Sequence, residues 1–78
     1  MNIEKFEEIL RWKYDKGVTS FIGNVSGNKY EIYRGTNPKT TRNYCVRING
    51  KPIKVNTNFF AVACTIYDAE MEVCVGEM

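Results

Sequence analysis

The stretch NYCVRINGKPIKVN, residues 43–56, constrains the fold more than any other part of the chain. Its centre, Asn49-Gly50, stands between two runs in which apolar and polar residues alternate. Asn and Gly adopt positive φ angles at little cost, so this dipeptide predicts the two-residue turn of a β-hairpin. A type I′ turn here sets Val46 opposite Ile53. We therefore expect at least one antiparallel pair of strands.

The two faces of this predicted hairpin differ in character. The first face carries the apolar residues Tyr44, Val46, Ile48, Ile53 and Val55, and the second carries Cys45, Arg47, Pro52 and Lys54. Side chains alternate between the faces of a strand, so the first set predicts a core face and the second an outward, basic face. Proline cannot donate a ladder hydrogen bond, so we expect the strand of Pro52 at an edge of the sheet.

An earlier hairpin is predicted from residues 18–25 and 29–34, which are rich in β-branched and aromatic residues. A turn at Gly27-Asn28 sets Val25 opposite Tyr30. In the same register Gly23 faces Ile32, and a glycine inside a strand indicates a bulge or close packing under a helix. Residues 35–42, GTNPKTTR, are polar and turn-forming, which predicts a long loop between the two hairpins.

An N-terminal helix is predicted from Ile3 to Lys16. Its apolar residues recur three and four positions apart: Ile3, Phe6, Ile9, Leu10 and Tyr14. Asn2 is placed to cap the first turn and Gly17 to end the helix. The remaining charged positions Glu4, Glu7, Glu8 and Arg11 are interpreted as an ordinary solvated face, on which Glu7 and Arg11 have the spacing of a favourable ion pair.

The last third of the chain is ambiguous. Residues 58–69 predict a helix if Phe59, Val62, Ala63 and Ile66 form a stripe, and a strand if Phe60, Val62, Cys64 and Ile66 alternate. We slightly favour the helix. The run MEVCV, residues 71–75, alternates cleanly and predicts a final strand. The expected fold is α+β: an N-terminal helix on a small antiparallel sheet of hairpins, with a second helix near the C-terminus.

Composition narrows the class of protein. The chain has 78 residues, of which 44% are hydrophobic and 26% charged, as expected of one globular domain spanning residues 1–78. It contains no apolar run long enough to cross a membrane, and its N-terminus lacks the pattern of a signal peptide. We expect a cytoplasmic protein that does not associate with membranes.

Little in the sequence points to catalysis. The chain has no histidine, the residue best suited to acid–base work near neutral pH. Its three cysteines, Cys45, Cys64 and Cys74, form no metal-binding spacing, and we interpret them as small reduced hydrophobes. We therefore expect no catalytic residues, no metal site and no cofactor.

Charge is distributed unevenly along the chain. Residues 29–54 hold seven lysines and arginines and one acidic residue, a net charge of +6. Residues 55–78 hold four acidic residues and no basic one, a net charge of −4. Candidate residues for contacting a partner or a phosphate are Arg34, Lys39, Arg42, Arg47 and Lys54. Tyr33 and Trp12 are candidate interface aromatics, although for Trp12 a place at the margin of the core is favoured over an interface role.

These features favour a binding protein without enzymatic activity. Eight asparagines and seven lysines suggest AT-rich coding, which suits a phage or mobile element. The leading hypothesis is an accessory protein that binds and inhibits a host protein with an acidic surface, such as a defence or nucleic-acid-handling protein. The alternative is a nucleic-acid or nucleotide-binding module that uses the basic hairpins. The oppositely charged parts of the chain also leave a homodimer open.

Overall fold

The computed structural model describes residues 2–37 and 39–76, with side chains as far as Met71. In chain order the elements are helix α1 (Ile3–Asp15), strands β1 (Ser20–Ile22), β2 (Lys29–Arg34), β3 (Tyr44–Ile48) and β4 (Lys51–Thr57), and helix α2 (Phe59–Gly76). The strands form one antiparallel sheet in the order β1-β2-β3-β4. This arrangement confirms the predicted α+β class.

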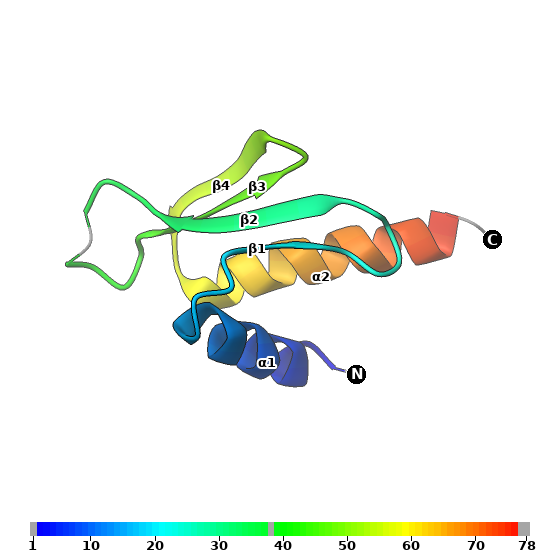
Figure 1. Cartoon of the computed structure of the whole chain (residues 1–78), viewed down its shortest axis with the longest axis horizontal. Coiled ribbons are helices and arrows are strands. Elements are labelled where there is room, and N and C mark those ends of the chain that lie inside the picture. The colour runs from blue at the N-terminus through cyan, green and yellow to red at the C-terminus, as the bar shows by residue number, and fades with distance from the viewer. Residues whose placement is uncertain (1, 38, 77–78) are drawn as a thin grey trace.

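Both helices lie on the same side of the sheet (Figure 1). α2 packs against β3 and β4, and α1 packs along α2. α1 also reaches the sheet through Tyr14, whose ring centroid lies 5.7 Å from that of Tyr44 on β3. Among the described residues no helix or strand covers the opposite face of the sheet.

α1 forms where its apolar stripe and its cap predicted it. The Asn2 side chain accepts a hydrogen bond of 2.8 Å from the Lys5 amide, which satisfies one of the free donors of the first turn. Gly17 follows the helix with φ of +96°, a conformation that an L side chain rarely adopts. Leu10 is the buried residue of the stripe and joins the core.

The core lies between the sheet and α2. Its buried residues are Leu10, Tyr30, Ile32, Val46, Phe59, Val62, Ala63 and Ile66. The stripe of Phe59, Val62, Ala63 and Ile66 is thus buried at helical spacing, which confirms the helix over residues 58–69 and shows that the strand alternative was wrong. Asn58 caps this helix, because its Oδ1 accepts the Ala61 amide at 2.7 Å.

The predicted final strand at residues 71–75 is wrong, because α2 continues to Gly76. Between Phe59 and Val75 the sequence has no Gly, Pro or Asn that would end a helix. The helix therefore continues through residues 71–75, although their apolar and polar residues alternate as in a strand. Within the described part of the chain, no helix combines the length and apolar character needed to cross a bilayer.

The register of the first hairpin also differs from the prediction. Phe21, rather than Val25, is the partner of Tyr30. Strand β1 ends at Ile22, and residues 23–28 form a longer loop closed by a hydrogen bond of 2.9 Å from the Gly23 amide to the Asn28 carbonyl. A side chain on α2 fixes this loop, as described below, and local sequence carries no sign of that contact.

The second hairpin keeps its predicted turn but loses its predicted register. Asn49 and Gly50 have φ of +53° and +83°, and Arg47 pairs with Pro52 as expected. Beyond that pair, two irregularities shift the strands, so that Val46 faces Lys54 instead of Ile53. β4 therefore does not present Ile53 and Val55 to the core: they are 46% and 59% exposed, and their assignment to a core face was wrong.

Two further predictions about this hairpin have opposite outcomes. β4 is an edge strand, as Pro52 predicted. Cys45, which was assigned to the open face, is fully buried, and its sulfur lies 3.4 Å from the Asn56 amide at the second irregularity. Burial of Cys45 agrees with its interpretation as a small hydrophobe. Cys64 is only partly buried, and the side chain of Cys74 lies outside the described residues.

Candidate functional site

The helix-free face of the sheet is the first candidate site. We use the name outer surface for this face together with edge strand β4, and its main residues are Glu31, Tyr33, Arg47, Pro52, Ile53, Lys54 and Val55. On β2 the half-buried residues Glu31 and Tyr33 alternate with the buried Tyr30 and Ile32, so they point away from the helices. Arg47 on β3 is the Cα partner of Glu31 and shares this face.

The aromatic and cationic residues of the outer surface are held together. The guanidinium carbon of Arg47 lies 4.1 Å from the centroid of the Tyr33 ring. Stacking of this kind holds an arginine in place while its planar donors remain directed outward. Both residues were predicted from the sequence to contact a partner, and the structure brings these two together.

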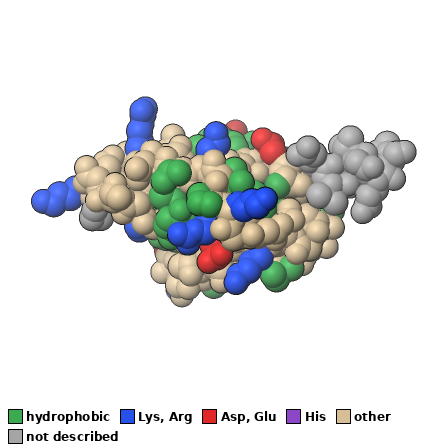
Figure 2. Space-filling model, turned by 90° about the horizontal axis from the view of Figure 1, so that it is seen from above, with side chains coloured by type: hydrophobic (Ala, Val, Ile, Leu, Met, Phe, Trp, Pro, Cys, Tyr) green, Lys and Arg blue, Asp and Glu red, His purple; other side chains and the backbone are tan. Residues whose placement is uncertain are grey.

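Strand β4 adds apolar area beside this pair. Ile53 and Val55 are exposed, and exposed Lys51 and Lys54 flank them. Figure 2 looks onto the side of the sheet away from the helices and shows hydrophobic side chains gathered in its middle, with Lys and Arg side chains around them. A cluster of exposed apolar side chains with a charged rim is the usual composition of a protein-binding surface.

A second candidate site is a cavity of about 450 Å³ at the opposite, helix-covered side of the sheet. We call it the basic cavity. It is lined by Arg11, Arg34, Lys39, Thr40, Thr41, Tyr44, Asn58, Phe59 and Phe60. These residues come from α1, the end of β2, the loop after β2, β3 and the first turn of α2, so the cavity forms only in the folded chain. Three of the described lining residues are cationic and none is acidic.

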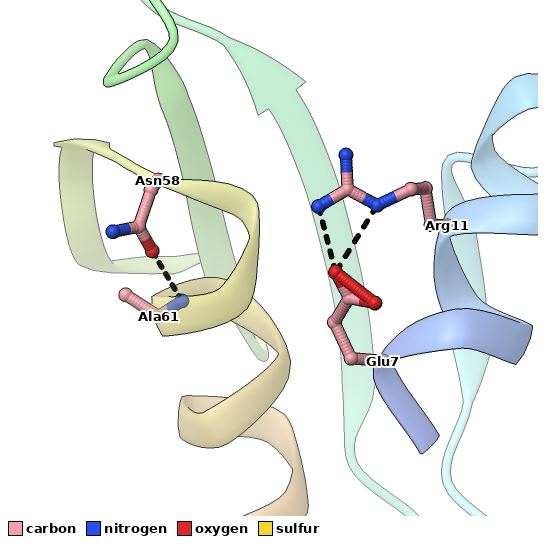
Figure 3. Close-up of polar contacts among 4 residues, drawn as sticks. All are labelled: Glu7, Arg11, Asn58 and Ala61. Carbon is pink, nitrogen blue, oxygen red and sulfur yellow. Dashed lines mark hydrogen bonds and ion pairs between the residues drawn. The ribbon is translucent and has the colours of Figure 1, made fainter. Parts of the chain in front are cut away.

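Two arginines of the basic cavity rest on one pair of rings. Tyr44 and Phe59 meet edge to face with centroids 5.2 Å apart. The guanidinium of Arg34 lies 4.5 Å from the Tyr44 ring and that of Arg11 lies 4.8 Å from the Phe59 ring. Arg11 also donates from Nε and Nη2 to one oxygen of Glu7, at 3.1 Å and 2.6 Å. Figure 3 shows its third nitrogen pointing away from Glu7.

The loop that brings Lys39 to the cavity is fixed by asparagines. Oδ1 of the buried Asn43 accepts the Asn37 amide at 3.1 Å, and the Gly35 amide donates to the Asn43 carbonyl at 2.8 Å. The Asn37 side chain in turn accepts the Lys39 amide at 3.3 Å. Polar side chains therefore replace an apolar anchor at the described residues Asn37 and Lys39 of this loop.

A carboxylate on α2 fixes the loop between β1 and β2. Glu70 accepts hydrogen bonds from the Val25 and Ser26 amides at 3.0 Å and 3.3 Å, from the Tyr30 hydroxyl at 2.6 Å and from the Ser26 hydroxyl. Partial burial raises the pKa of Glu70, but these hydrogen bonds outweigh it, so the net pKa lies below the ordinary carboxyl value. Burial, and next the bond to Glu70, raise the pKa of Tyr30. We interpret this cluster as a structural clamp.

The sequence-predicted site residues fall into separate groups. Tyr33 and Arg47 share the helix-free face and Lys54 lies on the edge strand β4 opposite Val46, whereas Arg34 and Lys39 line the basic cavity on the helix side of the sheet. Arg42 is exposed in the loop and lines neither. Trp12 on α1 is 62% exposed, so it is not a core residue, and it lies in the helix layer apart from the outer surface.

Sequence reasoning missed several residues of these sites. Arg11 was assigned to a solvated face, and its ion pair with Glu7 is confirmed, but its side chain also lines the basic cavity. Ile53 and Val55 were assigned to the core. Phe60, which is 45% exposed at the cavity, was considered only as part of an alternating strand. A helix with its stripe at Phe59, Val62, Ala63 and Ile66 places Phe60 beside that stripe. The helical spacing therefore could have predicted that Phe60 is exposed.

Comparison with known proteins adds no assignment: no protein-family model, curated protein or solved structure matches this chain. The geometry of the described residues also offers no obvious metal site, because among them no three cysteine or carboxylate side chains come together as ligands. The outer surface and the basic cavity are therefore the two candidate sites of the described chain.

Proposed function

We propose that the protein is a non-catalytic binding protein that docks onto an acidic surface of another protein through its outer surface. The observation that carries this proposal is the uncovered sheet face on which Arg47 is stacked on Tyr33, together with the edge strand β4, whose Ile53 and Val55 are exposed. Tyr and Arg are the residue types most often responsible for binding energy at protein interfaces, and neighbouring apolar side chains exclude water from them.

The charge of the outer surface indicates the chemistry of the partner. Arg47, Lys51 and Lys54 outnumber the acidic Glu31 there. Opposite charges across an interface speed association and exclude wrong partners. A second copy docked through the same surface would set these cations against themselves, which disfavours a symmetric dimer through this face. An acidic partner protein fits better.

The narrower hypothesis is that the partner is a host protein, and that the chain inhibits it as an accessory protein of a phage or mobile element. Support for this comes from sequence composition alone. The alternative of nucleic-acid binding through the five predicted basic residues is less favoured, because Arg34 and Arg47 lie on opposite sides of the sheet. One nucleic-acid strand would contact only part of the set.

Site-specific photo-crosslinking tests the docking proposal. A benzophenone side chain replaces Val55 on the outer surface or, for comparison, Trp12 on α1, and the purified protein is irradiated in lysate of the source cells. We expect a discrete protein adduct from position 55, identified by mass spectrometry as a protein with an acidic surface. Arg47→Glu should abolish that adduct, whereas the matched change Arg42→Glu should leave it intact.

Several outcomes would contradict the proposal. They are adducts from position 12 alone, an adduct from position 55 that survives Arg47→Glu, or cross-links from position 55 to nucleic acid. Fluorescence anisotropy with labelled single-stranded DNA, duplex DNA and RNA at two salt concentrations complements this test. Tight binding that is lost with salt and in Arg47→Glu would favour the nucleic-acid alternative, since phosphate contacts are strongly salt-dependent.

A further inference from the structure

We propose that the basic cavity binds the phosphate of a nucleotide. The cavity is independent of the outer surface, since its lining comes from the helix side of the sheet and from the loop after β2. Three features of its described residues support this proposal: a cluster of cations, a helix N-terminus with no acidic residue in its first turn, and an exposed ring.

The cations of the basic cavity are arranged before any ligand arrives. Arg11 and Arg34 are stacked on the adjoining rings of Phe59 and Tyr44, and Lys39 reaches the same cavity from the loop. Positive charges that converge on one space repel each other, and the carboxylate of Glu7 pairs with Arg11 at one side of them. An anion between them relieves this repulsion. The planar fork of an arginine also matches the geometry of a phosphate.

The first turn of α2 adds to the positive electrostatic potential of the basic cavity. The N-terminus of a helix carries a partial positive charge, which acidic residues of the first turn commonly offset. The first turn of α2 has no acidic residue, whereas α1 has Glu4. Asn58 accepts the Ala61 amide (Figure 3). Asn58 is also one of the residues that line the cavity. The helix end therefore adds to the field of the three cations and does not by itself make the site.

The size and the aromatic side chains of the cavity point to a nucleotide in preference to a bare phosphate. A volume of about 450 Å³ lies within the range of small-ligand pockets. Phe60 lines this cavity and is 45% exposed overall, and an exposed aromatic ring provides a face on which a nucleobase stacks. Thr40 and Thr41 add hydroxyl groups suited to sugar or phosphate oxygens.

Titration of the ¹⁵N-labelled protein followed by NMR tests this inference. The probes are AMP, adenosine, inorganic phosphate and a 5′-phosphorylated single-stranded oligonucleotide. We expect AMP to shift the amide signals of residues 39–41 and 58–60, and to bind more tightly than inorganic phosphate. Adenosine should shift the signals of residues 58–60 only weakly, because it can stack on Phe60 but offers no phosphate to the cations. Stronger binding of the oligonucleotide at the same signals would identify a nucleic-acid strand as the source of the nucleotide, and stronger binding of AMP a free nucleotide.

Matched variants in one loop connect the shifts to the cavity. Lys39→Ala should weaken AMP binding about tenfold, the usual effect of losing one charge-assisted contact. Arg42→Ala removes the same charge outside the cavity and should change the affinity less than twofold. Phe60→Ser should lower the affinity for AMP to that for inorganic phosphate. The spectrum of each variant shows directly whether the fold is retained.

The inference fails if millimolar AMP and oligonucleotide shift no signal of residues 39–41 or 58–60. It also fails if Lys39→Ala and Arg42→Ala weaken binding equally, or if AMP and inorganic phosphate bind equally well. None of these results bears on docking through the outer surface, since Arg47 and Val55 do not line the basic cavity.

Discussion

Replacing Glu70 by Gln should destabilise the fold at neutral pH by an amount that disappears in acid. Gln keeps an oxygen acceptor but loses the negative charge that strengthens the bonds from Ser26, Tyr30 and the Val25 amide. A hydrogen bond to a charged group contributes roughly 1.5–3 kcal/mol when buried. Because Glu70 is only partly buried, we expect a loss of about 1.5 kcal/mol for Gln and about 2.5 kcal/mol for Ala.

The stabilisation contributed by Glu70 should depend on pH. Since the hydrogen bonds lower the pKa of Glu70 in the folded state, its contribution is fully present above the unfolded pKa of about 4.3. The contribution is lost as the pH falls through the lower, folded pKa. The difference in unfolding free energy between the wild type and Glu70→Gln should therefore be greatest at neutral pH and diminish progressively as the pH falls below the unfolded pKa.

Urea denaturation followed by circular dichroism measures this difference. A protein of this size has a denaturant slope near ~1 kcal/mol/M, so the midpoint should shift by about 1.5 M at neutral pH. Asp68→Asn on the same helix removes an equal charge from an exposed position and serves as the control. A Glu70→Gln midpoint equal to that of the control, or a difference that persists unchanged at pH 3, would refute the clamp.

Three further predictions concern single positions. Gly50→Ala should cost about 1–2 kcal/mol because Gly50 has φ of +83°, and thermal denaturation should show no comparable loss for Lys51→Ala. Gly23→Ala should also destabilise the fold, because a Cβ there meets the Glu70 carboxylate, and a double-mutant cycle should show a smaller penalty in the Glu70→Ala background. Trp12→Ala should cost less than about 0.5 kcal/mol, since its side chain is 62% exposed, and a larger loss in urea would contradict its place outside the core.

The sequence correctly predicted those elements that depend on residues close together in the chain. The stripe and cap of α1, the Asn49-Gly50 turn and the edge position of Pro52 follow from spacing, φ preference and the missing amide. The helix at Phe59 also followed from its stripe, although β-branched and aromatic residues made a strand almost as plausible. In α2 the docking of that stripe on the sheet decides between the two, and it carries the helix past Met71.

Strand register depended on contacts that no local pattern records. The loop after β1 is set by Glu70, which lies more than forty residues away from Val25 along the chain. Strand β4 shifts against β3 where Asn56 adopts φ of +53° beside the buried Cys45. Each shift of one residue reverses the face that a side chain occupies. Residues assigned to the core in a regular hairpin were therefore exposed, and the apolar part of the outer surface could not be foreseen.

The basic middle of the chain shows why a charge count does not by itself define a binding surface. Residues 29–54 carry a net charge of +6, which suggests one basic patch. The pleat of the sheet separates neighbours, so that Tyr33 faces outward with Arg47 while Arg34 faces the helices and stacks on Tyr44.

The basic residues of one sequence block thus lie on two separate surfaces of the fold. Each surface also includes side chains from other parts of the chain, which the charge pattern does not identify. The outer surface gains Val55 through a shift in register, and the basic cavity gains Arg11 from α1 and Phe60 from α2. Because the two sets share no side chain, substitutions such as Lys39→Ala and Arg47→Glu should affect separate binding activities. A variant that abolished both while retaining the fold would require a connection through β2, where Tyr33 and Arg34 are adjacent.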